Sequence, residues 1–238
     1  MPVAYQIYAS TDFPLRDSFE TEDQLSLLND VEENIEVTST SVVISSAHSV
    51  SGFIRYDVFH EFLVRLQYLG RARGREFREF VSPYKFRMFI AESTSNGTFR
   101  PLLIRTKKKV ASDFVTRVNN KIPGFTARPT VVDFASLRPS LTLIRGAWFG
   151  SMRQRNISAT GVFGHQVDQS DEFRHAESIG ELRNIIIELE IDGGTHTVML
   201  SIDGGIVLYN VYQNEEEELV IVCGILSNLL QGCIAPVS

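Results

Sequence analysis

The longest periodic apolar pattern in the chain runs from Asp57 to Val81, and it constrains the fold more than any other segment. At about 100° per residue, its large apolar side chains fall within one arc of roughly 120°, the pattern of an amphipathic helix that buries one side. Because this phase continues across Gly70 and Gly74, the pattern predicts one continuous helix that ends before Pro83. The apolar residues of the arc are Phe59, Phe62, Leu63, Leu66, Leu69, Phe77, Phe80 and Val81.

The C-terminal part of the chain predicts an antiparallel β-meander. From Leu141 onward, short alternating segments are separated by turn sequences such as Asp192-Gly193-Gly194 and Asp203-Gly204-Gly205, which favour hairpins. A last helix is expected after Asn214, because Asn is a preferred helix cap and the glutamates that follow stabilise the positive end of a helix dipole. The candidate strands are 141–149, 156–163, 183–191, 195–202 and 205–212.

Together these patterns predict an α+β fold. The N-terminal half, 1–125, is expected to pack the long helix over 57–81 against a small sheet. The C-terminal half, 126–238, is expected to be the meander, covered by the last helix, and the two halves can also form one continuous domain. The other expected elements are strands over 2–9, 36–46, 84–92 and 98–105, and helices over 20–34, 107–120 and 168–180.

Charge is separated along the chain, although the formal net charge is only −6. Residues 1–50 carry a net charge of −8, residues 51–130 carry +10 and residues 131–238 carry −8. One interpretation is that the basic middle is a surface for a polyanion, where Lys and Arg displace counterions from phosphates. The other is that an acidic segment of the same chain, or of another subunit, pairs with the basic middle. The sequence pI of about 5.4 counts against a dedicated nucleic-acid binder.

Two groups of basic residues are candidates for binding an anion. On the expected helix, Arg71, Arg75 and Arg78 form a stripe that faces away from the apolar arc. Arg73 points into the arc, so either its head reaches solvent or a buried carboxylate, or the helix breaks at the neighbouring glycines. The second group lies at the start of the expected helix over 107–120, where free N–H groups attract phosphates, with a solvated or internally paired turn as the alternative. This group consists of Arg105, Lys107, Lys108 and Lys109.

The only tryptophan, Trp148, lies next to Phe149 in a segment that also contains Arg145, Arg153 and Arg155. Aromatic side chains interleaved with arginines can stack bases and hold phosphates. A tryptophan on a strand is also a common core residue, which is the structural alternative.

The segment from Gly164 to His175 gathers potential metal ligands. Glu172 and His175 are three residues apart, so on a helix they share one side, and His165 and Asp168 are further weak candidates. The chain has no second Glu-x-x-His motif and no His-Glu-x-x-His motif, so we expect no metal site and interpret the acids as a capped helix start.

No motif in the chain identifies an enzyme. A P-loop, a dinucleotide-binding glycine pattern and a Gly-x-Ser-x-Gly elbow are all missing from the sequence. We therefore expect a non-enzymatic binding protein without a cofactor, whose basic middle engages nucleic acid or another polyanion. The first alternative is a subunit of a protein assembly, homo-oligomeric or multi-subunit, in which the basic middle meets an acidic surface. The second is a metal-dependent nuclease or phosphodiesterase.

Location is expected to be cytoplasmic. The sequence shows no basic and apolar leader, and no apolar run long enough to span a membrane. Its two cysteines, Cys223 and Cys233, are too few for a disulfide framework and are interpreted as free thiols in a reducing compartment.

Overall fold

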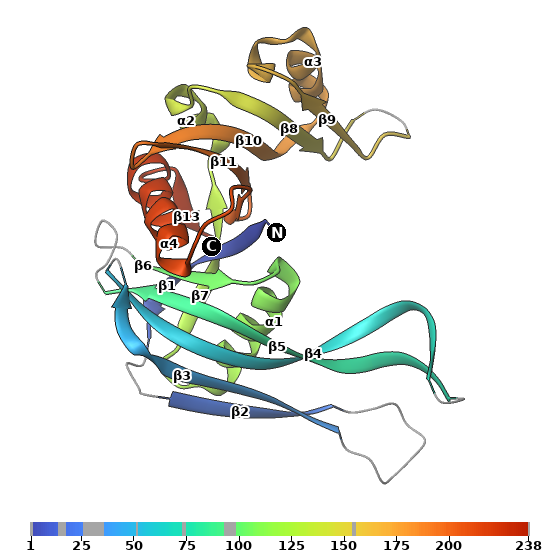
Figure 1. Ribbon diagram of the computed structural model, residues 1–238. Helices are drawn as coiled ribbons and strands as arrows, with labels where there is room; N and C mark the ends of the chain where they lie inside the picture. The colour runs from blue at the N-terminus through green and yellow to red at the C-terminus, as the bar shows by residue number, and fades with distance from the viewer. Residues whose placement is uncertain are drawn as a thin grey trace. The chain divides into compact units, whose positions relative to one another are not determined.

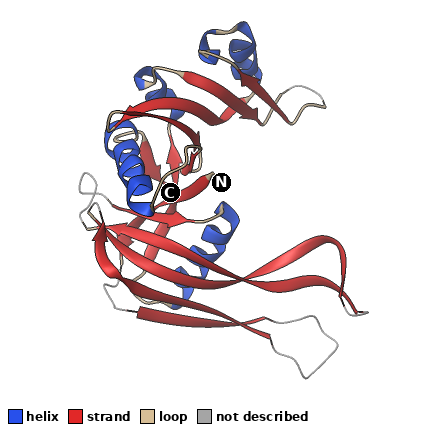
Figure 2. Cartoon of the chain, in the orientation of Figure 1, coloured by secondary structure: helices blue, strands red, loops and turns tan. Residues whose placement is uncertain are grey.

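The protein is described by a computed structural model that covers residues 2–13, 18–25, 36–50, 52–72, 75–92, 99–153 and 156–237. Antiparallel strands dominate it, with a few short helices (Figures 1 and 2). The chain divides into two compact units. We call the first the meander unit (Met1–Ala9, Val50–Gly52 and Arg128–Ser238) and the second the hairpin unit (Ser10–Ser49 and Phe53–Ala127).

The hairpin unit is an antiparallel sheet with one helix packed on it. The strand order is β2-β3-β4-β5-β6, so neighbours in sequence are also neighbours in space. A helix follows the last strand, as the sequence predicts. The elements are β2 (Ser18–Leu25), β3 (Glu36–Val50), β4 (Phe53–Ala72), β5 (Arg75–Ala91), β6 (Arg100–Arg105) and α1 (Lys108–Lys121).

The core of the hairpin unit lies between α1 and one face of this sheet. Val110, Phe114 and Val118 are buried on α1 at the i, i+4, i+8 spacing of one helix side. Every second residue of β4 from Tyr56 to Phe62 is buried as well, as expected for a strand with one packed face. The rings of Phe86 and Phe114 meet edge to face with centroids 5.4 Å apart, which joins the sheet to the helix.

The two longest strands form a ribbon. β4 and β5 pair from Phe53↔Ala91 to Ala72↔Arg75, whereas β6 pairs only with Arg87–Ile90 of β5. Figure 1 shows the two strands continuing together beyond β6. The register shifts between Arg65 and Gly70, so residues 66–69 form a bulge.

In the meander unit the antiparallel strand order is β1-β12-β11-β10-β8-β9, which belongs to the same sheet. β7 pairs with β1 and with β13. The strands are β1 (Val3–Asp12), β7 (Thr126–Val132), β8 (Ile144–Gly150), β9 (Ala159–Phe163), β10 (Glu181–Ile191), β11 (Gly194–Ser201), β12 (Gly205–Leu208) and β13 (Ile234–Pro236). The helices are α2 (Phe134–Leu137), α3 (Asp171–Ile179) and α4 (Glu215–Gly224), with short helical turns at η1 (Arg138–Ser140), η2 (Val167–Gln169) and η3 (Ile225–Leu229).

Helices cover one face of this sheet. The ring of Phe173 on α3 lies 5.1 Å from that of Phe149 on β8, centroid to centroid. The carboxylate of Glu218 on α4 accepts a hydrogen bond from the Tyr5 hydroxyl on β1, at 2.9 Å. Asn214 caps α4 by accepting from the N–H of Glu217 at 3.0 Å, which confirms the predicted helix start. We call this covered side the packed face.

The α+β prediction is wrong, because the protein is mostly antiparallel β-sheet. The expected helix over 57–81 is instead the outer part of the β4–β5 ribbon. Its apolar residues fit a helical phase, but His60, Val58 and Tyr56 extend the pattern at a period of two, and aromatic and β-branched residues favour strands. The proposed stripe is therefore split, with Arg71 on β4 and Arg75 and Arg78 on β5.

A second expected helix, 20–34, is also wrong where it can be compared. Residues 20–25 belong to β2, and 26–34 lie outside the described residues. Arg73, the proposed test of helix continuity, also lies outside them. Among the described helices, none is long and apolar enough to cross a membrane.

Candidate functional site

Three strands of the meander unit each carry three consecutive apolar residues, at 185–187, 198–200 and 206–208. Successive side chains of a strand point to opposite faces, so the outer two residues of each triplet enter the packed face and the middle one points away from it. The outer residues are fully buried, and the middle residues, Ile186, Met199 and Val207, are half-buried. An antiparallel sheet usually presents polar side chains on its solvent side, so these three residues are unusual.

The three middle residues are direct neighbours across the sheet. Ile186 pairs with Met199, and Met199 pairs with Val207. On the other side, Ile186 pairs with Gly146, which pairs with Phe163 of β9. An apolar row therefore runs across five strands on the side opposite the packed face. We call this surface, formed by Phe163, Ile186, Met199, Val207 and the flanking Trp148 and Tyr209, the open face.

Phe163 is the most exposed member of the row, at 59%. Its ring covers two glycines, because a Cβ atom at Gly146 or Gly161 would lie 3.0 or 2.8 Å from it. The ring also meets that of Trp148 edge to face, with centroids 4.7 Å apart. Two glycines on neighbouring strands thus allow an aromatic side chain to lie flat on the sheet, where it extends the apolar surface.

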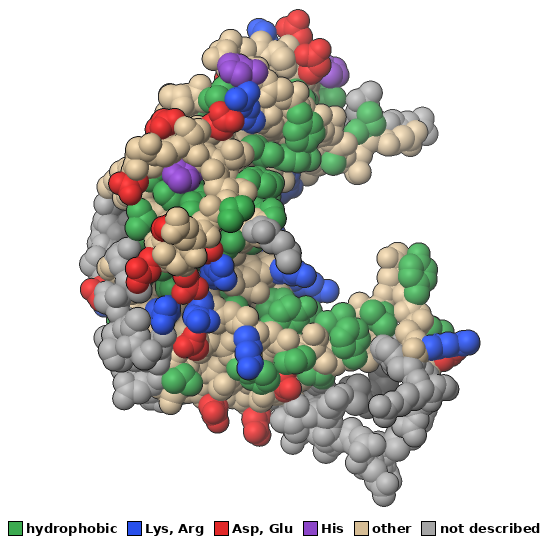
Figure 3. Space-filling view, viewed as in Figure 1, with side chains coloured by type: hydrophobic (Ala, Val, Ile, Leu, Met, Phe, Trp, Pro, Cys, Tyr) green, Lys and Arg blue, Asp and Glu red, His purple; other side chains and the backbone are tan. Residues whose placement is uncertain are grey.

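Tyr209 borders the other end of the open face and is 40% exposed. Its hydroxyl lies 3.8 Å from the sulfur of Met199. A shallow depression of about 400 Å³ opens here between Ile186, Thr197, Tyr209 and Asn210. Figure 3 shows hydrophobic side chains at the surface of the molecule in its upper part. Contiguous exposed apolar surface of this kind marks interaction sites in soluble proteins.

The meander unit as a whole is acidic. The meander unit contains seven Lys and Arg against fourteen Asp and Glu, a net charge of −7. Arg145, which the sequence suggested as a phosphate ligand, pairs with Glu188 through two contacts of 2.9 and 3.1 Å. Arg153 is exposed after β8, and Arg155 lies outside the described residues. Trp148 thus lies on the open face of an acidic unit, which does not favour a polyanion there.

Basic and acidic segments meet inside the hairpin unit. It contains sixteen Lys and Arg and fifteen Asp and Glu, a net charge of +1, although residues 51–130 alone carry +10. Along the ribbon, Arg71 contacts Glu76 at 2.5 Å, Arg65 contacts Glu79 at 2.8 Å and Arg87 contacts Asp57 at 2.8 Å. Of the proposed arginine stripe, Arg78 is exposed, and the side chain of Arg75 is not described.

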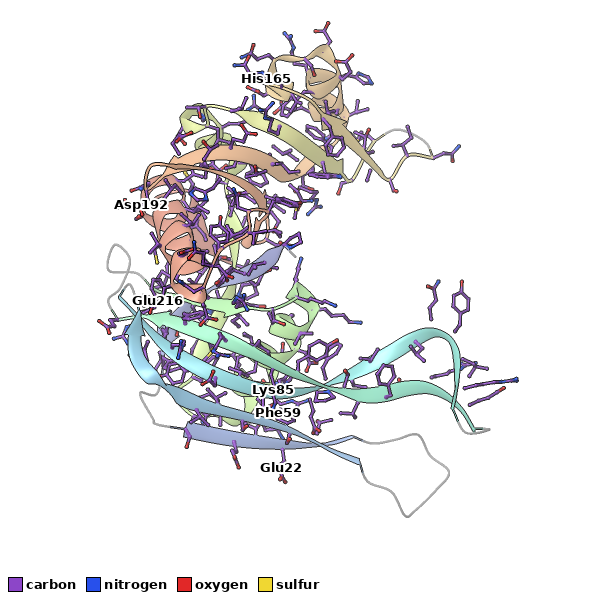
Figure 4. All side chains as sticks on the ribbon, in the orientation of Figure 1. Glu22, Phe59, Lys85, His165, Asp192 and Glu216 are labelled. Atoms are coloured by element: carbon purple, nitrogen blue, oxygen red, sulfur yellow. The ribbon has the colours of Figure 1, made fainter. Side chains whose placement is uncertain are left out.

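The proposed lysine group stays together at the start of α1. Lys107, Lys108 and Lys109 are exposed, and no side chain caps the helix at Lys107. Lys109 reaches the Phe62 ring, with its Nζ atom 5.5 Å from the centroid, a cation–π contact. Arg105 ends β6 and is half-buried. Figure 4 labels Lys85 on the neighbouring strand β5, which adds another exposed cation to this unit.

Of the four metal candidates, only two line the same pocket. Glu172 and His175 line a pocket of about 280 Å³, whose other walls include Met152, Ile157 and Val162. His165, labelled in Figure 4, and Asp168 are not among its lining residues. Across the described residues, no group of three or more His, Cys, Asp or Glu side chains is arranged to hold a metal ion.

A hydrogen-bonded chain in the hairpin unit links the buried Thr40 and His60 to the partly exposed Asp113. The imidazole Nδ1 lies 2.8 Å from the Thr40 hydroxyl, and Nε2 lies 3.0 Å from a carboxylate oxygen of Asp113. Arg117 donates to the same hydroxyl at 3.0 Å. Although these residue types resemble a nucleophilic triad, Thr40 and His60 are both 0% exposed, so no substrate reaches the hydroxyl. The chain instead fastens α1 to β3 and β4.

The shifted pKa values lie outside the open face. Burial raises the pKa of the Cys223 thiol to about 11. Burial, followed by the Glu218 carboxylate, raises the pKa of Tyr212. Hydrogen bonds from Ser136, first from its hydroxyl and then from its N–H, lower the pKa of Asp133, which caps α2. None of these groups lines either pocket, so they point to no acid–base chemistry there.

Comparison with protein-family models and with curated proteins gave no match. No protein-family model matches the chain, and no curated protein is significantly similar to it in sequence.

Proposed function

We propose that this chain is a non-enzymatic protein-binding subunit that receives its partner on the open face. The observation that supports this is the in-register apolar row of Phe163, Ile186, Met199 and Val207 on the side of the sheet opposite the helices. Burying such a row against another protein stabilises the complex by about 25 cal/mol for each Å² of apolar area removed from water.

The acidity of the meander unit suggests the chemistry of the partner. A partner surface with apolar side chains at its centre and Lys or Arg around them would match the apolar row and the net charge of −7 of the meander unit. This version of the assembly hypothesis differs from the sequence-based one, in which the basic middle makes the contact. In the basic middle, the arginines at 65, 71 and 87 already have carboxylate partners on the ribbon.

Site-specific photo-cross-linking in the native cell tests this proposal. A photoreactive phenylalanine analogue would replace Phe163 in one variant and the exposed Lys85 in a matched control. We expect a protein to cross-link at position 163 and not at position 85, and to form a stoichiometric complex when both purified proteins are mixed. The proposal would be contradicted if position 163 captured no protein, or if the captured protein did not bind this chain when both were purified.

A second candidate function is polyanion binding at the start of α1. The uncapped helix start with three exposed lysines supports it, because free N–H groups and nearby cations favour phosphate oxygens. Charge reversal of Lys107, Lys108 and Lys109 should weaken binding of a duplex oligonucleotide and flatten its salt dependence. Arg174→Glu, a change at an exposed arginine of the meander unit, is the control. Unchanged affinity in the lysine variant would exclude this candidate.

A further inference from the structure

β9 (Ala159–Phe163) is the last strand of the meander sheet, and among the described strands it pairs only with β8. Its second edge is therefore not used by a strand of the described chain. Exposed backbone N–H and C=O groups on such an edge can pair with another chain.

One hydrogen bond identifies the groups that point to this free edge. The N–H of Gly164 donates to the carbonyl of Arg145 at 3.0 Å, and these positions continue the β8–β9 register. In an antiparallel pair, hydrogen-bonded and non-hydrogen-bonded positions alternate. Residues 160 and 162 therefore bond to β8, whereas the backbone groups of Ala159, Gly161 and Phe163 point outward.

The edge lacks the features that usually prevent pairing. Proteins protect edge strands with charged side chains, prolines or bulges. The sequence of β9, Ala-Thr-Gly-Val-Phe, has no charge and no proline, and its register with β8 is regular from Gly146↔Phe163 to Gly150↔Ala159. A neutral edge matters in a unit with a net charge of −7, because two such units would repel each other at most other contacts.

We propose that β9 pairs with β9 of a second copy of this chain, antiparallel and centred on Gly161, so that the two meander sheets become continuous. This proposal concerns the strand edge and does not depend on partner binding by the open face. The register is self-complementary. Ala159 lies opposite Phe163 of the other copy, and each of the three outward pairs exchanges two hydrogen bonds, about six in total.

Side-chain sizes fit this register. On the open-face side, the small residues Ala159 and Gly161 leave room beside Phe163, whose ring already lies over Gly161. On the other side, Thr160 of one copy lies opposite Val162 of the other, a β-branched pair that suits a sheet surface. A two-fold axis through Gly161 closes the assembly at two copies, as expected for an isologous interface.

The test combines molecular mass with backbone amide exchange. Sedimentation of the full chain over about a hundredfold concentration range should show a monomer–dimer equilibrium. As the dimer population increases, the amides of residues 159, 161 and 163 should become protected from hydrogen exchange. Those of residues 160 and 162 should be protected at every concentration because they bond to β8. A monomer at all concentrations would overturn the proposal.

Ala159→Pro is the decisive variant, because it removes an outward N–H and keeps the bonds to β8. It should weaken dimerisation at least tenfold while its thermal unfolding stays cooperative. If proline perturbs the fold, Ala159→Lys places a charge on the same edge. Tyr209→Ser is the matched control, since it changes the open face and leaves β9 intact. A dimer that survives both changes at position 159 would overturn the proposal, and loss of partner binding in Tyr209→Ser alone would concern the open face only.

Discussion

The ring of Phe163 meets the ring of Trp148 at an interplanar angle of 82°, with centroids 4.7 Å apart. This pair joins β9 to β8 on the open face and places an exposed phenylalanine against the only tryptophan of the chain. Edge-to-face pairs of this kind stabilise by about 0.5–1.5 kcal/mol beyond the area that they bury. The tryptophan therefore reports directly on the state of the open face.

Phe163→Ala should shift the emission of Trp148 to longer wavelength and increase its quenching by acrylamide. The ring of Phe163 shields the indole, and its removal exposes the tryptophan to water. Steady-state fluorescence measures this without interference from another tryptophan. Arg174→Ala, on α3, should leave the spectrum unchanged, and an unchanged spectrum in Phe163→Ala would contradict the packing described for this pair.

Thr40→Val should destabilise the hairpin unit by about 1–3 kcal/mol, because it leaves the buried Nδ1 of His60 without its partner and removes one acceptor of Arg117. Urea unfolding gives the free energy. Ser112→Ala, at an exposed position of α1, should change it by less than about 0.5 kcal/mol. Equal stability of Thr40→Val and the wild type would show that the buried chain does not fasten α1 to the sheet.

The stability of the ribbon should depend more on its buried apolar side chains than on its exposed ion pairs. Phe62 is 7% exposed and contacts Tyr84, with centroids 6.2 Å apart, so Phe62→Ala should cost about 3–5 kcal/mol. The Arg65 side chain is 76% exposed, so Arg65→Ala should cost less than about 1 kcal/mol even though it breaks the contact with Glu79. Chemical unfolding of both variants measures this ranking, and a larger loss of unfolding free energy for Arg65→Ala than for Phe62→Ala would contradict it.

Cys223 should react slowly with thiol reagents below pH 9, because burial raises its pKa to about 11 and only the thiolate reacts. In a Cys233→Ser background, the rate should rise with pH until about 11. The raised pKa also means that the folded state keeps the thiol proton up to a higher pH than the unfolded state does. The free energy of unfolding should therefore fall as the pH rises from about 9, the unfolded pKa, towards 11. Cys223→Ser should remove this part of the pH dependence, and a fast reaction at neutral pH would contradict the burial of the thiol.

Local signals predicted much of the meander unit. The turns at 192–194 and 203–205 and the cap at Asn214 are recognisable because each depends on residues a few positions apart. The helix over 57–81 was predicted wrongly because β4 is specified by pairing with β5 and by packing on α1, contacts that a helical phase within one segment does not contain.

The open face was missed for a related reason. Each apolar triplet shows that one side chain must face away from the core, and that signal is present in the sequence at 185–187, 198–200 and 206–208. What the sequence does not contain is the register that makes Ile186, Met199 and Val207 neighbours and brings Phe163 into the same row. The metal candidates separated similarly, since only Glu172 and His175 share a side of α3.

If the open face binds a protein, the affinity of the cross-linked partner must depend on the apolar side chains of that face. Isothermal titration would compare the wild type with the open-face variant Phe163→Ser/Met199→Thr and with the control Lys85→Ser. We predict at least tenfold weaker binding for the open-face variant, about 1.4 kcal/mol or more, and unchanged binding for the control. Equal affinity of the open-face variant and the wild type, with thermal unfolding unchanged, would contradict partner binding by the open face.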